Sequence, residues 1–190
     1  MFKLSSQELR SHIKELHAGD RVLLSGTVYT GRDAAHKRIF ELLDTGCELP
    51  IPLNEAIIYY AGPTPAQQGM PVGSCGPTTS SRMDKFAPRL LDLGLLGMIG
   101  KGERSQEVED AIVRNGSIYF CAVGGAGALI AKCVEEAEEI AFTELGCESI
   151  KRLKVRDLPL IVAIDCHGGN LYKTGRAQYA LDIRAERRLV

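Results

Sequence analysis

The sequence predicts a single α/β domain. Segments with strand character and segments with helix character alternate along all 190 residues, and neither a repeat nor a linker interrupts them. A chain of this length can bury a core without disulfide bonds. Its 45% apolar and 25% charged residues are ordinary for a globular domain. We therefore expect residues 1–190 to fold as one unit.

Charge and hydropathy exclude several classes of partner. The net charge of −1 argues against nucleic acid or an anionic membrane, because both require a basic excess. No apolar run approaches the roughly 20 residues of a membrane-spanning helix, and the N-terminus lacks the apolar segment of a signal peptide. We expect a cytoplasmic protein that binds neither nucleic acid nor membrane.

The cysteines do not form a metal-binding pattern. No Cys-x-x-Cys pair occurs, and no histidine lies at zinc-finger spacing. An iron–sulfur cluster held by this chain alone would need about four thiolates, usually with two close in sequence. We expect reduced thiols and no metal bound by this chain. Cys75 deserves note because it adjoins the Gly76 segment considered below.

The first elements follow from periodicity and caps. Residues 4–17 are expected to form the helix of an N-terminal unit, residues 1–20, because Ser5 and Glu8 make a capping box ahead of apolar residues on one face. Residues 21–29 are an apolar-biased strand. A second helix then opens near Arg32 and Asp33, directly after a strand end, which is where α/β proteins usually bind ligands.

The remaining elements are predicted in the same way. Pro88 should kink or break the helix over residues 80–93. Strands are expected over residues 56–61, 95–99, 118–123, 140–144 and 158–165; helices are expected after Ser105 to residue 114 and from the glycine turn to about residue 134. Residues 135–139 indicate a solvated acidic face. Residues 176–190 are expected to be a charged, partly disordered tail.

The stretch from Gly76 to Ser105 is the strongest candidate for a site. Thr78 and Thr79 follow a Gly-Pro break, and Lys101 lies between two glycines. Together with Arg32 and Arg82, which also follow turns, these residues suit a ligand with two carboxylates, because arginine forks bind carboxylates bidentately. The alternative is that each cation is an ordinary surface charge.

Nucleotide motifs are incomplete in this chain. The glycines at 124, 125 and 127 are followed by Ile130 where a dinucleotide fingerprint needs glycine, and Gly102 follows Lys101 where a P-loop needs Ser or Thr. A tight strand-to-helix turn explains these glycines better. Among the histidines, His36 stands out because it lies one helical turn from Arg32.

Three motifs together resemble a known family. They are Thr30-x-Arg-Asp-Ala-Ala-His-Lys-Arg, Gly76-Pro-Thr-Thr-Ser-Ser-Arg-Met and Lys101-Gly. They are similar to the β subunit of the iron–sulfur hydro-lyases, which comprise class I fumarate hydratases and L(+)-tartrate dehydratases. The resemblance implies a three-layer β/β/α swivelling domain, as in the C-terminal domain of class I fumarases. It also implies a partner α subunit that holds a [4Fe–4S] cluster through three cysteines.

The resemblance further implies roles for individual residues. Arg32, Arg82 and Lys101 would bind the substrate carboxylates, and Thr78 resembles the residue proposed as catalytic base. The remaining motif positions would support the site; they are Asp33, His36, Gly76 and Thr79. The partner's cluster would act as Lewis acid in the reversible addition of water to fumarate.

The substrate stays open at this point. Ala34-Ala35-His36 is fumarase-like, whereas the segment that begins at His167 resembles the tartrate enzymes. We expect fumarate, with tartrate as the alternative, since sequence alone resolves a small difference in substrate poorly. A different class of function is a non-catalytic module that binds dicarboxylates.

Overall fold

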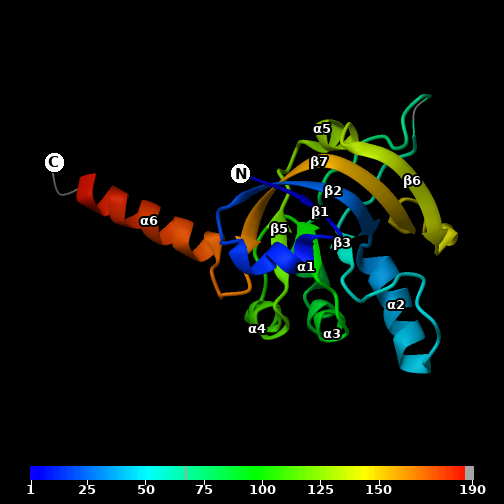
Figure 1. Cartoon of the computed structure of the whole chain (residues 1–190), viewed down its shortest axis with the longest axis horizontal. Coiled ribbons are helices and arrows are strands. Elements are labelled where there is room, and N and C mark those ends of the chain that lie inside the picture. Colours follow the sequence, from blue (N-terminus) through cyan, green and yellow to red (C-terminus); the bar gives the residue numbers. More distant parts are fainter. Residues whose placement is uncertain (67, 187–190) are drawn as a thin grey trace.

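The computed structural model describes residues 1–66 and 68–186. Within them, seven strands form one sheet in the order β1-β2-β3-β4-β5-β7-β6 (Figure 1). The strands are β1 (Phe2–Ser5), β2 (Arg21–Thr30), β3 (Ile57–Tyr59), β4 (Gly97–Gly100), β5 (Ile118–Cys121), β6 (Val134–Ala141) and β7 (Ile150–Ile164). Neighbours from β1 to β5 run parallel, whereas β7 is antiparallel to β2, β5 and β6.

Strand β7 closes the sheet on itself. One edge of β7 pairs with β2, where Leu153 lies opposite Val28, and the other edge pairs with β5 near its C-terminal end, where Val162 lies opposite Phe120, and with β6 near its N-terminal end. Because β7 joins β2 to β5, the two ends of the parallel run β2-β3-β4-β5 are connected, and these five strands surround a barrel-like interior. Figure 1 shows β2, β6 and β7 arching over the parallel strands on the side opposite α3 and α4.

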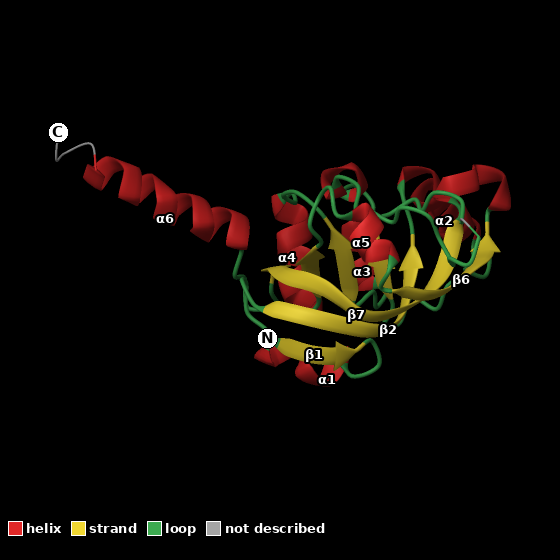
Figure 2. Ribbon diagram, turned by 90° about the horizontal axis from the view of Figure 1, so that it is seen from above, coloured by secondary structure: helices red, strands yellow, loops and turns green. Residues whose placement is uncertain are grey.

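Helices complete the architecture. They are α1 (Leu9–His12), α2 (Asp33–Thr45), α3 (Ala87–Asp92), α4 (Gln106–Asn115), α5 (Gly127–Ala131) and α6 (Leu171–Glu186), with shorter 3-10 turns η1 (Ile13–Glu15), η2 (Ser80–Met83) and η3 (Thr143–Glu148). Figure 2 shows α6 extending away from the rest of the molecule. Helices α2, α3 and α4 form the third layer on the outer face of the parallel strands, whereas α1 and α5 pack on the barrel core, so the chain forms the β/β/α arrangement predicted above.

Two hydrophobic cores lie on either side of the parallel strands. In the β3 region, Ile57 and Tyr59 pack inside the barrel, whereas Ile58 and Tyr60 pack against the helices. A strand that is buried on both faces is expected to be apolar throughout, and residues 57–61 are. The three layers therefore follow from the alternation of side chains along β3, β4 and β5.

Several predicted elements are confirmed with small shifts of their ends. The strands expected over residues 21–29, 56–61, 95–99 and 118–123 are β2, β3, β4 and β5, and the helices expected after Arg32 and Ser105 are α2 and α4. The segment 80–93 breaks into η2 and α3. Pro88 lies in the first turn of α3, where its missing N–H costs no helical hydrogen bond.

The expected N-terminal helix is wrong in its first part. Phe2–Ser5 forms β1, in which Leu4 lies opposite Leu24 of β2. The capping box itself exists, because the Ser5 hydroxyl bonds the Glu8 carboxylate at 2.7 Å and accepts the Glu8 N–H at 3.3 Å. It caps only the short run of α1 and η1, since pairing with β2 takes the residues before it.

Two predictions near the acidic segment are also wrong. The helix expected to reach residue 134 ends at Ala131, because β6 begins at Val134 and pairs with β7. The strand expected over residues 140–144 stops at Ala141. Phe142 has a left-handed backbone (φ 57°), which a strand cannot continue through, and η3 follows. The acidic side chains of β6 are exposed, as predicted.

The C-terminal segment differs from the expected tail. Over residues 176–186 the chain continues helix α6, where partial disorder was expected. The rest of that tail, residues 187–190, lies outside the described residues. In the described part of the chain, no helix combines the length and the apolar character needed to cross a membrane. The cytoplasmic location stays a prediction.

Candidate active site

The motif residues meet at the carboxyl ends of the parallel strands. The backbone N–H of Thr78 donates to the Tyr60 carbonyl at 2.7 Å, next to the end of β3. Thr79 pairs with Lys101 at the end of β4 in an isolated parallel bridge. The Ser80 N–H donates to the Lys101 carbonyl at 2.9 Å. The threonine segment is therefore fixed beside both strand ends, and Thr78 and Lys101 are partly exposed there.

A second set of contacts adds the two arginines to this edge. Arg32 ends the loop after β2 and precedes α2. Its neighbour Asp33 accepts a hydrogen bond at 2.9 Å from Nε of Arg82, which lies on η2. Together with the strand-end contacts, this pair places the segments that carry Arg32, Thr78, Arg82 and Lys101 side by side.

Asp33 orients Arg82 in a useful way. Because the carboxylate takes the Nε–H, the two terminal nitrogens of the guanidinium remain available for a ligand, and the Arg82 side chain is 49% exposed. A carboxylate bound by those two nitrogens would receive a bidentate pair of hydrogen bonds. Lys101 has no ion-pair partner among the residues that the structure describes, so its charge is also available.

His36 supports the loop that carries Arg32. Both its backbone N–H and its ring Nδ1 donate to the Arg32 carbonyl, at 2.9 and 2.8 Å. The ring is fully buried, and burial lowers the pKa of His36 to about 4, with the Arg104 charge acting in the same direction. His36 is therefore neutral at pH 7 with its proton on Nδ1, and it fixes the first turn of α2.

Glycines allow the loops around the site to come together. Gly127 lies close against the Gly76 segment. A Cβ on Gly127 would lie 3.1 Å from the Gly76 nitrogen and 2.3 Å from the Ser74 hydroxyl. The Cys75 N–H donates to the Gly127 carbonyl at 3.0 Å. The glycine turn after β5 thus packs on the Gly76 segment, which gives these glycines a structural purpose without a nucleotide.

Asp84 and Arg104 were not assigned a role from the sequence. The Arg104 side chain is fully buried between the rings of Tyr60 and Tyr119, and its Nε donates to Asp84 at 2.6 Å. Asp84 also accepts the Ser105 N–H at 2.7 Å. This buried pair ties the Arg82 motif to the Lys101 motif. The signal that could have found this pair is the opposite charge of Asp84 and Arg104, which lie just after the two motifs.

Cys75 belongs to the barrel core. Its side chain is fully buried, and burial raises the pKa of the thiol to about 12. The hydroxyl of Tyr59 donates to the Cys75 carbonyl at 2.6 Å and fixes the strand-like segment ahead of Gly76. Within residues 1–66 and 68–186, no group of three or more His, Cys, Asp or Glu side chains is arranged to hold a metal ion.

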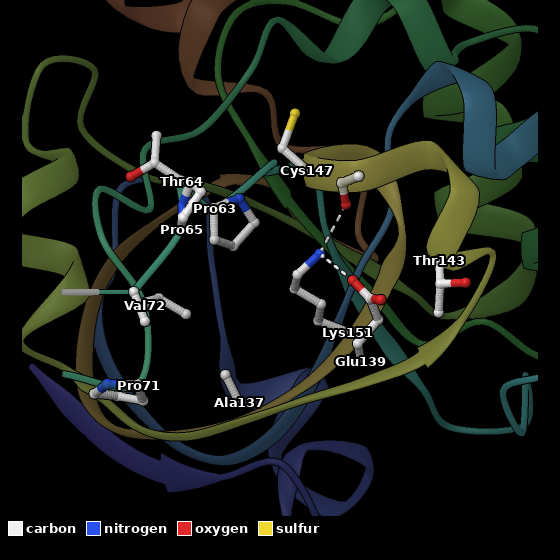
Figure 3. Close-up of a pocket in the computed structure, with 12 residues that line it drawn as sticks. Pro63, Thr64, Pro65, Pro71, Val72, Ala137, Glu139, Thr143, Cys147 and Lys151 are labelled. Carbon is white, nitrogen blue, oxygen red and sulfur yellow. Dashed lines mark hydrogen bonds and ion pairs between the residues drawn. The ribbon is translucent and has the colours of Figure 1, made fainter. Parts of the chain in front are cut away.

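A cavity lies beside the motif residues, not among them. Its volume is about 470 Å³, and Figure 3 shows it between the proline-rich loop after Gly62 and the β6 edge. Lys151 reaches into it but is paired with Glu139 at 3.2 Å. The lining of this cavity does not include Arg32, Thr78, Arg82 or Lys101; Arg82 is exposed and Thr78 and Lys101 are partly exposed at their own edge of the sheet.

Comparison with known proteins decides the family. The family model described as "Fumarase C-terminus" matches residues 1–175. The chain belongs to this family. The match includes all three motifs and stops within α6, so most of that helix lies beyond the part shared with the family. The resemblance stated from the sequence and the three-layer fold are both confirmed.

The relatives in this family are fumarate hydratases and a tartrate dehydratase subunit. The chain is 37% identical to "Fumarate hydratase class I, anaerobic" of Escherichia coli over 88% of this chain and 31% of that protein. It is 36% identical to "Fumarate hydratase 2" of Leishmania major, over 87% of this chain and 29% of that protein. It therefore spans about three tenths of the length of these fumarate hydratases.

One relative matches over nearly its whole length. The "Putative L(+)-tartrate dehydratase subunit beta" of Methanocaldococcus jannaschii is 38% identical over 86% of this chain and 87% of that protein. The family thus includes both a separate β subunit of this size and a C-terminal part of longer fumarate hydratases. The relatives so named are hydro-lyases, and their names differ in substrate.

Proposed function

We propose that this chain is the β subunit of a two-subunit iron–sulfur hydro-lyase that interconverts fumarate and (S)-malate. The observation that carries the proposal is the convergence of the segments that bear Arg32, Thr78, Arg82 and Lys101 at one edge of the sheet, within a member of the fumarase C-terminus family. A partner α subunit, which would hold a [4Fe–4S] cluster, would cover this edge.

Substrate binding would use the cations at that edge. The two terminal nitrogens of Arg82 would bind one carboxylate, and Arg32 and Lys101 would bind the other end of the dicarboxylate. Holding both ends fixes the double bond relative to Thr78. Asp33 and His36 would not touch the substrate, because the first orients Arg82 and the second holds the Arg32 loop.

Proton transfer is assigned to the Thr78 hydroxyl. A threonine hydroxyl is a very weak acid, so it could accept the malate C–H proton only if nearby cations stabilise its alkoxide. The same cations would stabilise the charge that develops on the carboxylate next to that carbon. The partner's cluster, when bound, would supply Lewis-acid iron for the departing hydroxyl.

The test is reconstitution with the cluster-bearing partner under anaerobic conditions. We expect the complex to consume fumarate, followed by the absorbance of its double bond, and the chain alone to be inactive. Thr78→Ala and Arg82→Ala should abolish turnover without preventing assembly. Thr78→Ser keeps a hydroxyl, and Arg89→Ala removes an exposed arginine paired with Asp44 on α2, so both should retain activity. If Thr78→Ala turned over at the wild-type rate, Thr78 would not be the catalytic base.

Tartrate is the alternative substrate. It is favoured by the Methanocaldococcus jannaschii relative, whose length this chain nearly matches. Parallel assays with fumarate, malate and L(+)-tartrate decide between the two hydro-lyase activities. Calorimetry of the lone chain with fumarate tests the non-catalytic class: tight binding by a chain that associates with no cluster protein would favour a binding module.

A further inference from the structure

Arg32 already holds a carboxylate in this structure. Oε1 of Glu148, at the end of η3, lies 3.1 Å from Nη2 of Arg32. Its Oε2 accepts the backbone N–H of Ala34 at 3.3 Å. Ala34 is in the first turn of α2, where the backbone N–H groups lack helical partners and carry partial positive charge. Glu148 therefore uses a guanidinium and a helix N-terminal amide together.

The pairing between Glu148 and Arg32 is incomplete. Nε of Arg32 is buried and has no hydrogen-bond partner among the described residues. Glu148 engages only one guanidinium nitrogen, whereas a carboxylate that bridges Nε and Nη2 would satisfy both. A buried donor left unpaired is costly, so a ligand that reaches both nitrogens gains relative to Glu148.

Glu148 lies on a segment whose Phe142 and Leu145 pack against the helix-side core, whereas its charged side chains lie nearer the surface. This segment connects β6 to β7, and both Phe142 and Gly146 adopt left-handed backbone conformations. It is held on α2 by Arg38, which pairs with Glu144 at 2.8 Å and lies 5.2 Å above the Phe142 ring. These contacts are partly exposed, so they cost little to rearrange.

We propose that Glu148 is a resident carboxylate that occupies Arg32 in the free enzyme and is displaced by a substrate carboxylate. The inference rests on the proposed function, in which Arg32 binds substrate. Displacement subtracts from the binding of every ligand, so a ligand also needs the contacts at Arg82 and Lys101 to bind well. With this common penalty, a monocarboxylate that reaches Arg32 without those further contacts stays too weakly bound to occupy the site at low concentration, whereas a dicarboxylate still binds.

The test uses the assembled enzyme with its cluster-bearing partner. If Glu148 covers Arg32 in about nine molecules of ten, Glu148→Gln should lower KM for fumarate about tenfold. It should lower the inhibition constant of succinate equally and leave kcat within about twofold. Crotonate, a monocarboxylate, should become a better inhibitor. The matched control is Glu138→Gln on β6, which removes an exposed charge paired with Arg152 of β7 and leaves the contacts of the Glu148 segment intact, so it should change neither constant.

Arg32→Ala distinguishes a failure of the proposed role of Arg32 in substrate binding from a failure of the proposed displacement of Glu148. We expect it to raise KM at least tenfold. If it does and Glu148→Gln leaves KM unchanged or raises it, the displacement idea is overturned and Glu148 merely orients Arg32. If Arg32→Ala leaves KM unchanged, Arg32 does not bind substrate, and both the assignment and this inference fall. Thermal unfolding of each variant shows whether the fold is kept.

Discussion

Replacing His36 with asparagine tests whether a buried neutral imidazole holds the Arg32 loop. Asparagine can still donate from its amide to the Arg32 carbonyl but does not titrate. In the folded chain the pKa of His36 is lowered to about 4 by burial, against 6.5 in the unfolded chain. Between these values the unfolded chain binds a proton that the folded chain excludes, so acid favours unfolding.

The size of the effect follows from that difference. The contribution of His36 to stability is complete above pH 6.5 and is lost as the pH falls toward 4. From pH 7.5 to 5.0 the loss is about 2 kcal/mol. Urea unfolding at several pH values should show the wild type losing about 2 kcal/mol more than His36→Asn over this range.

The control is His12→Asn, because the His12 side chain is 41% exposed and pairs only with Glu15 on the surface. This variant shows what the replacement of an exposed histidine by asparagine does to the same curve. The substitution at His36 also removes the contact of the imidazole with the Phe86 ring, and the resulting loss of stability does not depend on pH. The comparison therefore uses the slope of the free energy of unfolding against pH, and not its absolute value. Parallel curves for wild type and His36→Asn would show that the imidazole is not held neutral.

Three further predictions concern stability. Asp84→Ala should cost about 3–5 kcal/mol in urea unfolding, because it leaves the Arg104 charge buried without its partner. Gly100→Ala should lower the melting temperature, because a Cβ there would lie 1.9 Å from the Ser80 hydroxyl that bonds the Lys101 N–H; an unchanged temperature would contradict this packing. Gly175→Ala in α6 should raise helix stability by up to about 1 kcal/mol, since nothing lies within 4 Å of the new methyl group, and slower amide exchange in α6 would show it.

The sequence alone predicted those elements that are stabilised by residues close to one another in the chain. The buried strand β2, the amphipathic helix α4 and the break at Pro88 all follow from periodicity and backbone chemistry within a few residues. The elements that were wrong depend on partners far along the chain. β1 exists because Leu4 lies opposite Leu24, and β6 exists because Glu136 and Glu138 face Lys154 and Arg152 on β7.

The site shows the same division. The convergence of the Arg32, Thr78 and Lys101 segments could be predicted because parallel strands end at one edge of a sheet. Glu148 could not be found in this way, since it lies in a turn after an acidic strand and nothing near it in the sequence points to Arg32. The roles of the residues at this edge stay predictions until the variants are assayed.

The pairing of β7 with three strands also constrains how the protein is made. During synthesis, β2 leaves the ribosome more than a hundred residues before the strand that covers its free side. Until residues 150–164 emerge, the barrel interior and the open edge of β2 have only transient cover. Closure over such sequence separations is slow, which makes the nascent chain prone to aggregation. A bound chaperone or early partner would matter most in that interval.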